Sequence, residues 1–179
     1  YYDDTNPIVA RWTIKWALEH GVNLFVYDWY DWEYTEAPIN TLLNELNGFY
    51  LSYKDKAKFA LIWANHDTPT TIAQILAKLD RAEMKYFRQP QYFKIDNQPV
   101  FMIFNMQGLI DNFGLTGVND LLAQMKNNMK AKGYNGLYIV FNGDCNGLST
   151  TQPMVFDAVT AYNYSDLMAK PVDNYDNFI

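Results

Sequence analysis

The feature that most constrains this chain is a repeated pattern in which an apolar run ends abruptly in acids, amides or aromatic residues. Each run is typical of a buried strand, and the polar residues behind it mark the carboxyl end of that strand. Helical patterns fill most of the gaps between the runs, which predicts parallel strands joined by right-handed crossovers. The runs begin near residues 22, 58, 99, 137 and 158 and end in Asp28-Trp29-Tyr30, Trp63-Ala64-Asn65-His66, Phe104-Asn105, Phe141-Asn142 and Tyr162.

Two architectures satisfy this alternation, an open doubly wound sheet and a (β/α)8 TIM-type barrel. In both, the polar residues gather at one end of the sheet, where such folds bind ligands. A barrel needs eight strand–helix units, about 250 residues, and the 179 residues here supply about five. We therefore expect a single domain over residues 1–179 that is part of a barrel if the barrel architecture holds.

Local signals add detail to this expectation. Asn6-Pro7 predicts a helix start, because asparagine caps free N–H groups and proline suits the first helical position. In that helix Ile8, Trp12 and Trp16 recur every four residues, so we expect them to pack on the sheet. Pro38 predicts the start of the second helix. Asp96-Asn97 predicts a tight hairpin turn, since both residue types tolerate positive φ.

Composition excludes some classes of function. The net charge of −6 and the lack of a basic stripe argue against a nucleic-acid partner. No apolar stretch approaches the roughly 20 residues that span a bilayer. Cys145, the one cysteine, cannot form an internal disulfide and reads best as a buried inert thiol. The sequence starts at Tyr1 without a methionine, so we expect it to be processed or cut from a longer protein.

The residues at the strand ends suggest chemistry. Asp28 is the best single candidate for acid–base work, because a carboxylate at the tip of an apolar strand is partly desolvated. Capping a neighbouring backbone group or pairing with a lysine is an equal alternative. Glu33 and Glu36, near Asp31, could form a two-carboxylate site or hold calcium, but a solvated acidic loop is the better interpretation. His66 could transfer a proton or donate a hydrogen bond.

Other chemistries lose support. The sequence offers no second zinc ligand near His66, and phosphate-binding loops, serine elbows and H-E-x-x-H pairs do not occur in it. We expect no metal and no cofactor. What remains is a site of Trp, Tyr, Asn, Asp and His in a chain that is 17% aromatic. That mixture stacks on the apolar face of a sugar ring and bonds its hydroxyls, so the expected partner is an oligosaccharide or polysaccharide.

At this point the chain resembles a known family. The segments Asp4–Ile14, Lys15–Tyr30, Trp63–His66 and Tyr92–Phe101 look like those of glycoside hydrolase family 99 and the WbsX-type glycan-processing proteins. The resemblance implies a (β/α)8 barrel acting on mannose-type or related glycans, and a secreted or periplasmic location. It also implies that the sugar binds at the C-terminal end of the barrel strands. The residues of this chain that match the family's binding residues are Asp28, Trp29, Tyr30, Trp63, Asn65 and His66. The strand-end pattern adds Asn105, Asn142 and Tyr162 as candidate binding residues.

The chain also departs from that family. The family's catalytic glutamates lie close together in an Asn-Glu-Trp-type motif near the end of the barrel, and no such motif is present here. The catalytic residues are therefore unknown, with Asp28 and Glu33 as weak candidates. A glycoside hydrolase is the first hypothesis, and a non-catalytic glycan-binding protein on the same scaffold is the second; an unrelated open α/β domain is the third. An incomplete barrel is expected to self-associate or to pair with its missing segments.

Overall fold

The computed structural model describes residues 3–30, 33–48, 56–66, 71–142 and 155–160. Helices and strands alternate along the chain, as the sequence pattern predicts. The elements in order are α1 (Pro7–Glu19), β1 (Leu24–Trp29), α2 (Glu33–Asn47), β2 (Lys58–Trp63), α3 (Ile72–Ala82), the π-helix η2 (Glu83–Phe87), β3 (Lys94–Ile95), β4 (Gln98–Ile103), α4 (Met106–Ala131), β5 (Tyr138–Asn142) and β6 (Ala158–Thr160).

The main sheet has the strand order β1-β2-β4-β5-β6, and every neighbouring pair in it is parallel. The five predicted core strands are thus parallel and adjacent in chain order, which confirms that expectation. The register places Trp29 beside Trp63, and Trp63 beside Ile103. All carboxyl ends of these strands therefore lie at one end of the sheet, which we call the rim.

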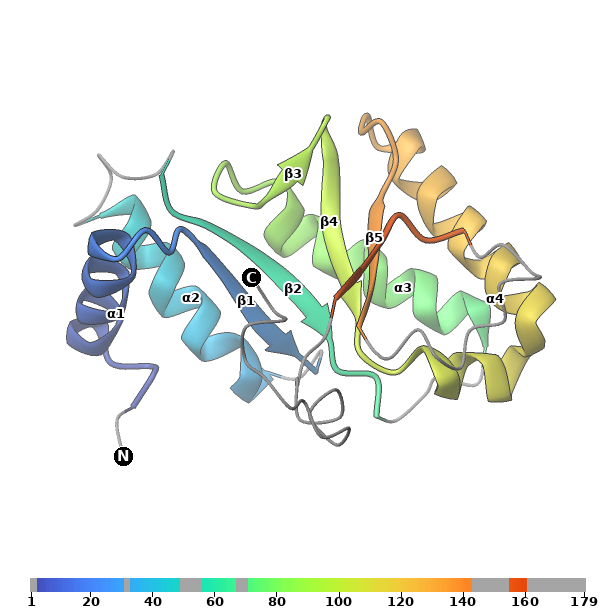
Figure 1. Cartoon of the computed structure of the whole chain (residues 1–179), viewed down its shortest axis with the longest axis horizontal. Helices are drawn as coiled ribbons and strands as arrows, with labels where there is room; N and C mark the ends of the chain where they lie inside the picture. The colour runs from blue at the N-terminus through green and yellow to red at the C-terminus, as the bar shows by residue number, and fades with distance from the viewer. Residues whose placement is uncertain (1–2, 31–32, 49–55, 67–70, 143–154, 161–179) are drawn as a thin grey trace, which may run out of the picture.

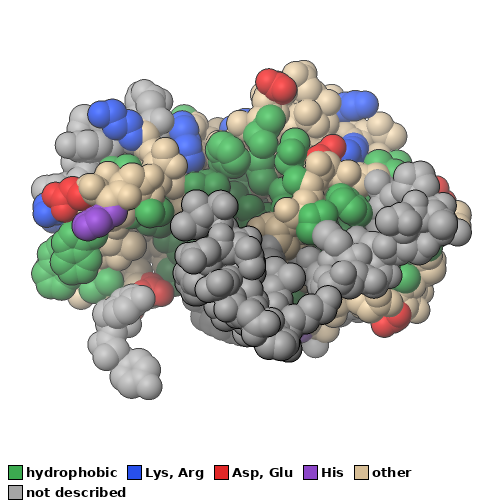
Figure 2. Space-filling view, viewed as in Figure 1, with side chains coloured by type: hydrophobic (Ala, Val, Ile, Leu, Met, Phe, Trp, Pro, Cys, Tyr) green, Lys and Arg blue, Asp and Glu red, His purple; other side chains and the backbone are tan. Residues whose placement is uncertain are grey.

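Alternation along the strands divides the side chains between two faces. Phe59, Leu61 and Trp63 of β2 point to the face that packs on the helices, and they belong to the main hydrophobic core. Figure 1 shows α2 and α3 on that face of the sheet. Ala60 and Ile62 point to the opposite face and are buried as well. Figure 2 shows hydrophobic side chains gathered over the central strands beside the part that grey residues cover. A sheet apolar on both faces is what a barrel wall requires.

The structure contains the helix cap and the hairpin turn that the sequence predicts, but the second helix starts at a different residue. The Asn6 side chain accepts a hydrogen bond from the Ile8 N–H at the start of α1. Asp96 and Asn97 have φ of 48° and 57°, so the two-residue hairpin between β3 and β4 is confirmed. Pro38 lies inside α2, which starts at Glu33. The second helix therefore begins five residues before the predicted point.

The packing predicted for α1 is wrong. Ile8, Trp12 and Trp16 are 53%, 53% and 56% exposed, and the two indole rings stack on each other with centroids 6.0 Å apart. Ala10 and Ile14 are the residues that α1 buries. The periodicity correctly showed an apolar face, but the sheet and α2 contact the other side of the helix. No helix among the described residues is long and apolar enough to cross a membrane.

Candidate functional site

The rim carries a row of three aromatic rings from three neighbouring strands. Tyr30 follows β1, His66 lies three residues beyond β2, and Phe104 follows β4. The rings of Tyr30 and His66 stack at a centroid distance of 5.7 Å and an interplanar angle of 25°. The rings of His66 and Phe104 lie 5.0 Å apart and are tilted by 58°. His66 is exposed and the other two rings are half-buried, so the row borders solvent.

Asn142 ends β5 next to this row. The register pairs Ile103 with Phe141, so the next residues, Phe104 and Asn142, are neighbours across β4 and β5. Asn142 is only 5% exposed, and its Oδ1 has no hydrogen-bond partner in the part of the chain that the structure describes. A buried acceptor left unpaired costs roughly 1–3 kcal/mol. Such an atom is suited to accept a hydrogen bond from a ligand hydroxyl.

Two further residues lie on this face of the sheet. Asp28 is one residue before the end of β1, in register with Val140 and so two residues below Asn142, and it is half-buried. Thr160 of β6 is paired with Asn142, and its hydroxyl adds a donor and an acceptor beside the unpaired amide oxygen. The site therefore combines flat rings, a carboxylate, an amide and a hydroxyl.

The stacking role predicted for two tryptophans is wrong. Trp29 is fully buried on the helix-facing side, edge-on to Tyr86 and Phe101, and its indole N–H bonds to Glu36 at 3.4 Å. Trp63 is 3% exposed in the same core. Strand parity explains the error, because residues 29 and 63 point away from the face that carries Asp28. Neither ring presents a face to a ligand.

The two asparagines after β2 and β4 brace the rim. The Asn65 side chain donates to the Asn105 carbonyl and accepts from the Asn105 N–H, both at 2.7 Å. The Asn105 side chain accepts from the Gly108 N–H at 2.8 Å and caps α4. These bonds fix the backbone directly behind Phe104. The structure gives both side chains a positioning role, and sugar contact by them stays a prediction.

The acids after β1 do not form a solvated loop. Glu36 lies inside α2, is 3% exposed, and accepts hydrogen bonds from Arg81 at 3.0 Å and Lys85 at 2.5 Å. Burial raises the pKa of Glu36, but the bonds from Lys85 and Trp29 and the charge of Arg81 outweigh it and hold the pKa below its usual value of 4.5. Glu36 is thus an ionised structural residue on the helix side.

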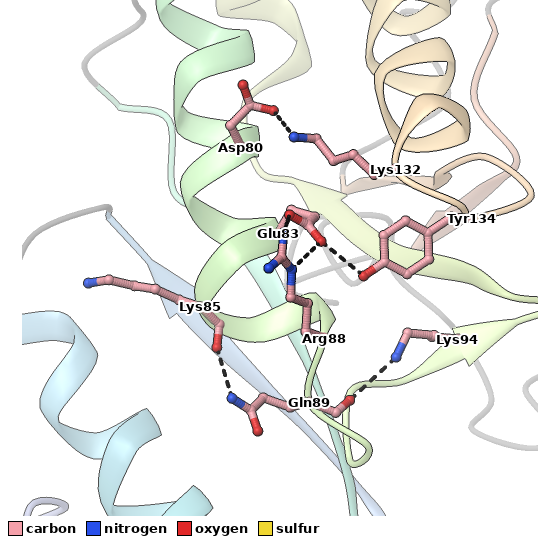
Figure 3. A network of polar contacts seen from close by, with 8 residues as sticks. All are labelled: Asp80, Glu83, Lys85, Arg88, Gln89, Lys94, Lys132 and Tyr134. Atoms are coloured by element: carbon pink, nitrogen blue, oxygen red, sulfur yellow. Dashed lines mark hydrogen bonds and ion pairs between the residues drawn. The ribbon is translucent and has the colours of Figure 1, made fainter.

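A second buried carboxylate belongs to the same helical layer. Glu83 of η2 forms two hydrogen bonds with Arg88, at 2.8 and 2.9 Å, and accepts one from Tyr134 (Figure 3). The bonds from Arg88 outweigh burial and lower the pKa of Glu83. These bonds join η2 to Arg88, which directly follows it, and to Tyr134, which lies between α4 and β5.

Some predicted site residues cannot be placed. Glu33 is the first residue of α2, but its side chain is outside what the structure describes, as are Asp31 and Tyr162. Within the described residues, no three His, Cys, Asp or Glu side chains gather into a group that could hold a metal ion. Phe104 and Thr160 were missed as site residues. An aromatic directly before the strand-end amide was the sequence signal for Phe104.

Comparison with known families supports this architecture. The family model described as "Glycosyltransferase WbsX" matches residues 1–177. The chain belongs to the WbsX family. A search of curated proteins finds no match for this WbsX-family chain.

Solved structures share its fold. The GH99 endo-alpha-mannosidase from Bacteroides thetaiotaomicron in complex with BIS-TRIS-propane superposes with a TM-score of 0.67 at 15% identity, over 90% of this chain and 48% of that one. A "Glycoside hydrolase-like protein" superposes with a TM-score of 0.62 at 18% identity, over 94% of this chain and 56% of that one. The WbsX-family chain therefore has the strand–helix arrangement of these (β/α)8 barrels and spans about half the length of the solved chains. The predicted partial barrel is confirmed.

Proposed function

We propose that this chain forms the glycan-binding part of a carbohydrate-active barrel that hydrolyses mannose-type or related glycans, with the sugar held at the rim. The observation that carries the proposal is the ring row of Tyr30, His66 and Phe104 beside the unpaired amide of Asn142. Rings bind the apolar face of a pyranose, and an unpaired buried acceptor binds one of its hydroxyls. Membership of the WbsX family and the GH99-like fold support the same class of ligand.

Asp28 is the described carboxylate that we assign to the sugar. It is on the same face of the sheet as Asn142, so it can accept a hydrogen bond from a hydroxyl or assist proton transfer. Hydrolysis ordinarily uses two carboxyl groups about 5–9.5 Å apart on either side of the glycosidic bond. We place the acid and the nucleophile elsewhere in the complete barrel, and a secreted or periplasmic location follows from that class of substrate.

Two alternatives remain open to test. The described rim offers Asp28 without a placed second carboxylate, which favours a non-catalytic glycan-binding protein on the same scaffold. The family description favours transfer to another sugar in place of hydrolysis. Both reactions exchange the group on the anomeric carbon and differ only in whether water or a sugar hydroxyl accepts it.

Calorimetry and product analysis separate these functions. We expect α-mannobiose to bind the 179-residue chain with a dissociation constant in the millimolar to micromolar range, and an extended protein that completes the barrel to release mannose from it. Incorporation of labelled oxygen from water into the product would identify hydrolysis, and a longer oligosaccharide would identify transfer. Binding without turnover by the extended protein would establish the non-catalytic alternative. Failure of the chain to bind any of a panel of manno-, gluco- and galacto-oligosaccharides would overturn the proposal.

A further inference from the structure

A cavity lies at the end of the sheet opposite to the rim. Its volume is about 500 Å³, within the range of small-ligand pockets. It opens where β1 and β2 begin, beside the C-terminal end of α1. Three apolar side chains and three polar ones line most of it, namely Leu18, Leu24 and Phe93, and Asn23, Lys56 and Lys58.

The ionisable side chains that line this cavity are all cationic, although the chain as a whole carries a net charge of −6. The Lys58 ammonium donates to the Pro90 carbonyl at 3.2 Å. Next to it, the Lys94 ammonium donates to the Gln89 carbonyl at 3.3 Å (Figure 3). Neither Lys58 nor Lys94 forms an ion pair with a carboxylate of the described residues.

Two ammonium groups held at adjacent carbonyls repel each other. Burial is the larger cause that lowers the pKa of Lys94, and the charge of Lys58 lowers it further. The C-terminal end of α1 borders the cavity, but a helix end carries only about half a negative charge, which offsets little of two full positive charges. Lys94 does not line the cavity, but its charge interacts with that of Lys58, so positive charge gathers at the edge of the apolar wall.

We propose that this cavity binds a small organic anion, with a phosphate, sulfate or carboxylate group at Lys58 and Asn23 and an apolar or ring-shaped part against Leu24 and Phe93. An oxyanion accepts charge-assisted hydrogen bonds from ammonium and amide donors. It also removes the repulsion between Lys58 and Lys94. This site is separate from the rim, because it lies at the amino ends of the strands, and its occupancy does not depend on the proposed glycan function.

Calorimetric titration of the 179-residue chain at constant ionic strength tests the proposal. The probes are inorganic phosphate, phenyl phosphate and benzoate, with phenol as the uncharged control. We expect saturable binding of all three anions, tightest for phenyl phosphate because it uses both the cations and the apolar wall, and no binding of phenol. Lys58→Met should weaken phenyl phosphate about tenfold, since it removes a charged donor while keeping much of the side-chain volume.

Lys130→Met on α4 is the matched control, because Lys130 is an exposed lysine outside the cavity, and we expect it to leave the affinity unchanged. A Lys58→Arg variant keeps the charge and should retain most of the binding, which separates a lost anion contact from a folding defect. Absence of saturable binding by all three anions overturns the proposal. The proposal is also overturned if Lys58→Met and Lys130→Met weaken phenyl phosphate binding equally. The effect would then come from the change in net charge and not from a contact in the cavity.

Discussion

At the scale of single residues, the ring row of the rim shows how ordinary side chains gain a role from their neighbours. His66 alone is an exposed imidazole, but Tyr30 and Phe104 hold it in a continuous aromatic surface. We expect Phe104→Ala to weaken glycan binding about ten- to a hundredfold, because it removes a large apolar contact worth roughly 1–3 kcal/mol. Calorimetry with α-mannobiose measures the change. Trp12→Ala, an exposed ring on α1, is the control and should have no effect.

Asn142 gives a prediction in which stability and binding move in opposite directions. Its Oδ1 is buried without a partner in the described part of the chain, so the apolar replacement Asn142→Leu removes an unpaired acceptor. We expect unfolding in urea to require an unchanged or higher denaturant concentration, with a gain of up to about 1 kcal/mol. Glycan affinity should fall at least fivefold. A variant that is less stable and binds normally would show that the amide is structural.

Glu36 gives the pH dependence of stability. Its folded pKa is lowered, so its ion pairs stabilise the fold fully above the unfolded value near 4.5, and this contribution is lost as pH falls through the lower folded value. Glu36→Gln should cost about 2 kcal/mol at pH 7, reduced from the cost for a fully buried pair because Arg81 and Lys85 are partly exposed.

Urea denaturation of both proteins between pH 7 and pH 3 checks this. The stability difference between wild type and the Glu36→Gln variant should shrink as the solution is acidified below pH 4.5. Glu19→Gln, which breaks an exposed pair with Lys15, should change little at any pH. A difference that stays constant down to pH 3 would mean that the charge of Glu36 is not what stabilises the fold.

Residue positions were predictable where the strand pattern alone sets them. Tyr30 and His66 follow strands and Asn142 ends one, and the structure places all three at the rim. The sequence does not show which face Trp29 and Trp63 occupy, because a strand buried on both sides shows no alternation of polarity. It does not show that Glu36 is buried and paired, because the partners Arg81 and Lys85 lie 45 and 49 residues away.

At the scale of elements, the bracing of the rim loop by Asn65 is the contact that the sequence could not show. One side chain pairs both the N–H and the carbonyl of Asn105, so its loss leaves two backbone groups unpaired. We expect Asn65→Ala to cost about 2–3 kcal/mol in urea denaturation. Asn135→Ala is the control, because its single bond to the Asp96 carbonyl is exposed and should cost under about 1 kcal/mol. Equal costs would contradict the bracing role.

Element boundaries were predictable only where a local bond defines them. Asn6 begins α1 where the sequence predicts it, and a Thr71–Gln74 capping box begins α3. The start of α2 differs from the prediction because Pro38 is tolerated within its second turn. α4 consists of two helical segments on either side of Gly114, a non-helical residue whose φ is 67°. A glycine marks a break in a helix as readily as its beginning.

At the scale of the whole molecule, the edge of the described sheet gives a prediction of how this chain behaves in solution. β1 ends the described sheet, and Val22 and Val26 are 52% and 44% exposed beside it. On α1, Ile8, Trp12 and Trp16 form a second group of exposed apolar side chains. An unpaired strand next to clustered apolar side chains is a site for association. This chain covers 48% and 56% of the two solved chains that share its fold.

We therefore expect the 179-residue chain to self-associate at micromolar concentrations. Sedimentation velocity should show a mean mass that rises with concentration, and Trp12→Ser with Trp16→Ser should shift the chain towards monomer, because half-exposed indoles supply the largest apolar area on α1. Met84→Ser, which removes a 60% exposed side chain on η2, is the control and should leave the association unchanged. A chain that stays monomeric at all concentrations, melts cooperatively at high temperature and leaves its tryptophans open to acrylamide quenching would show that the exposed surface needs no partner.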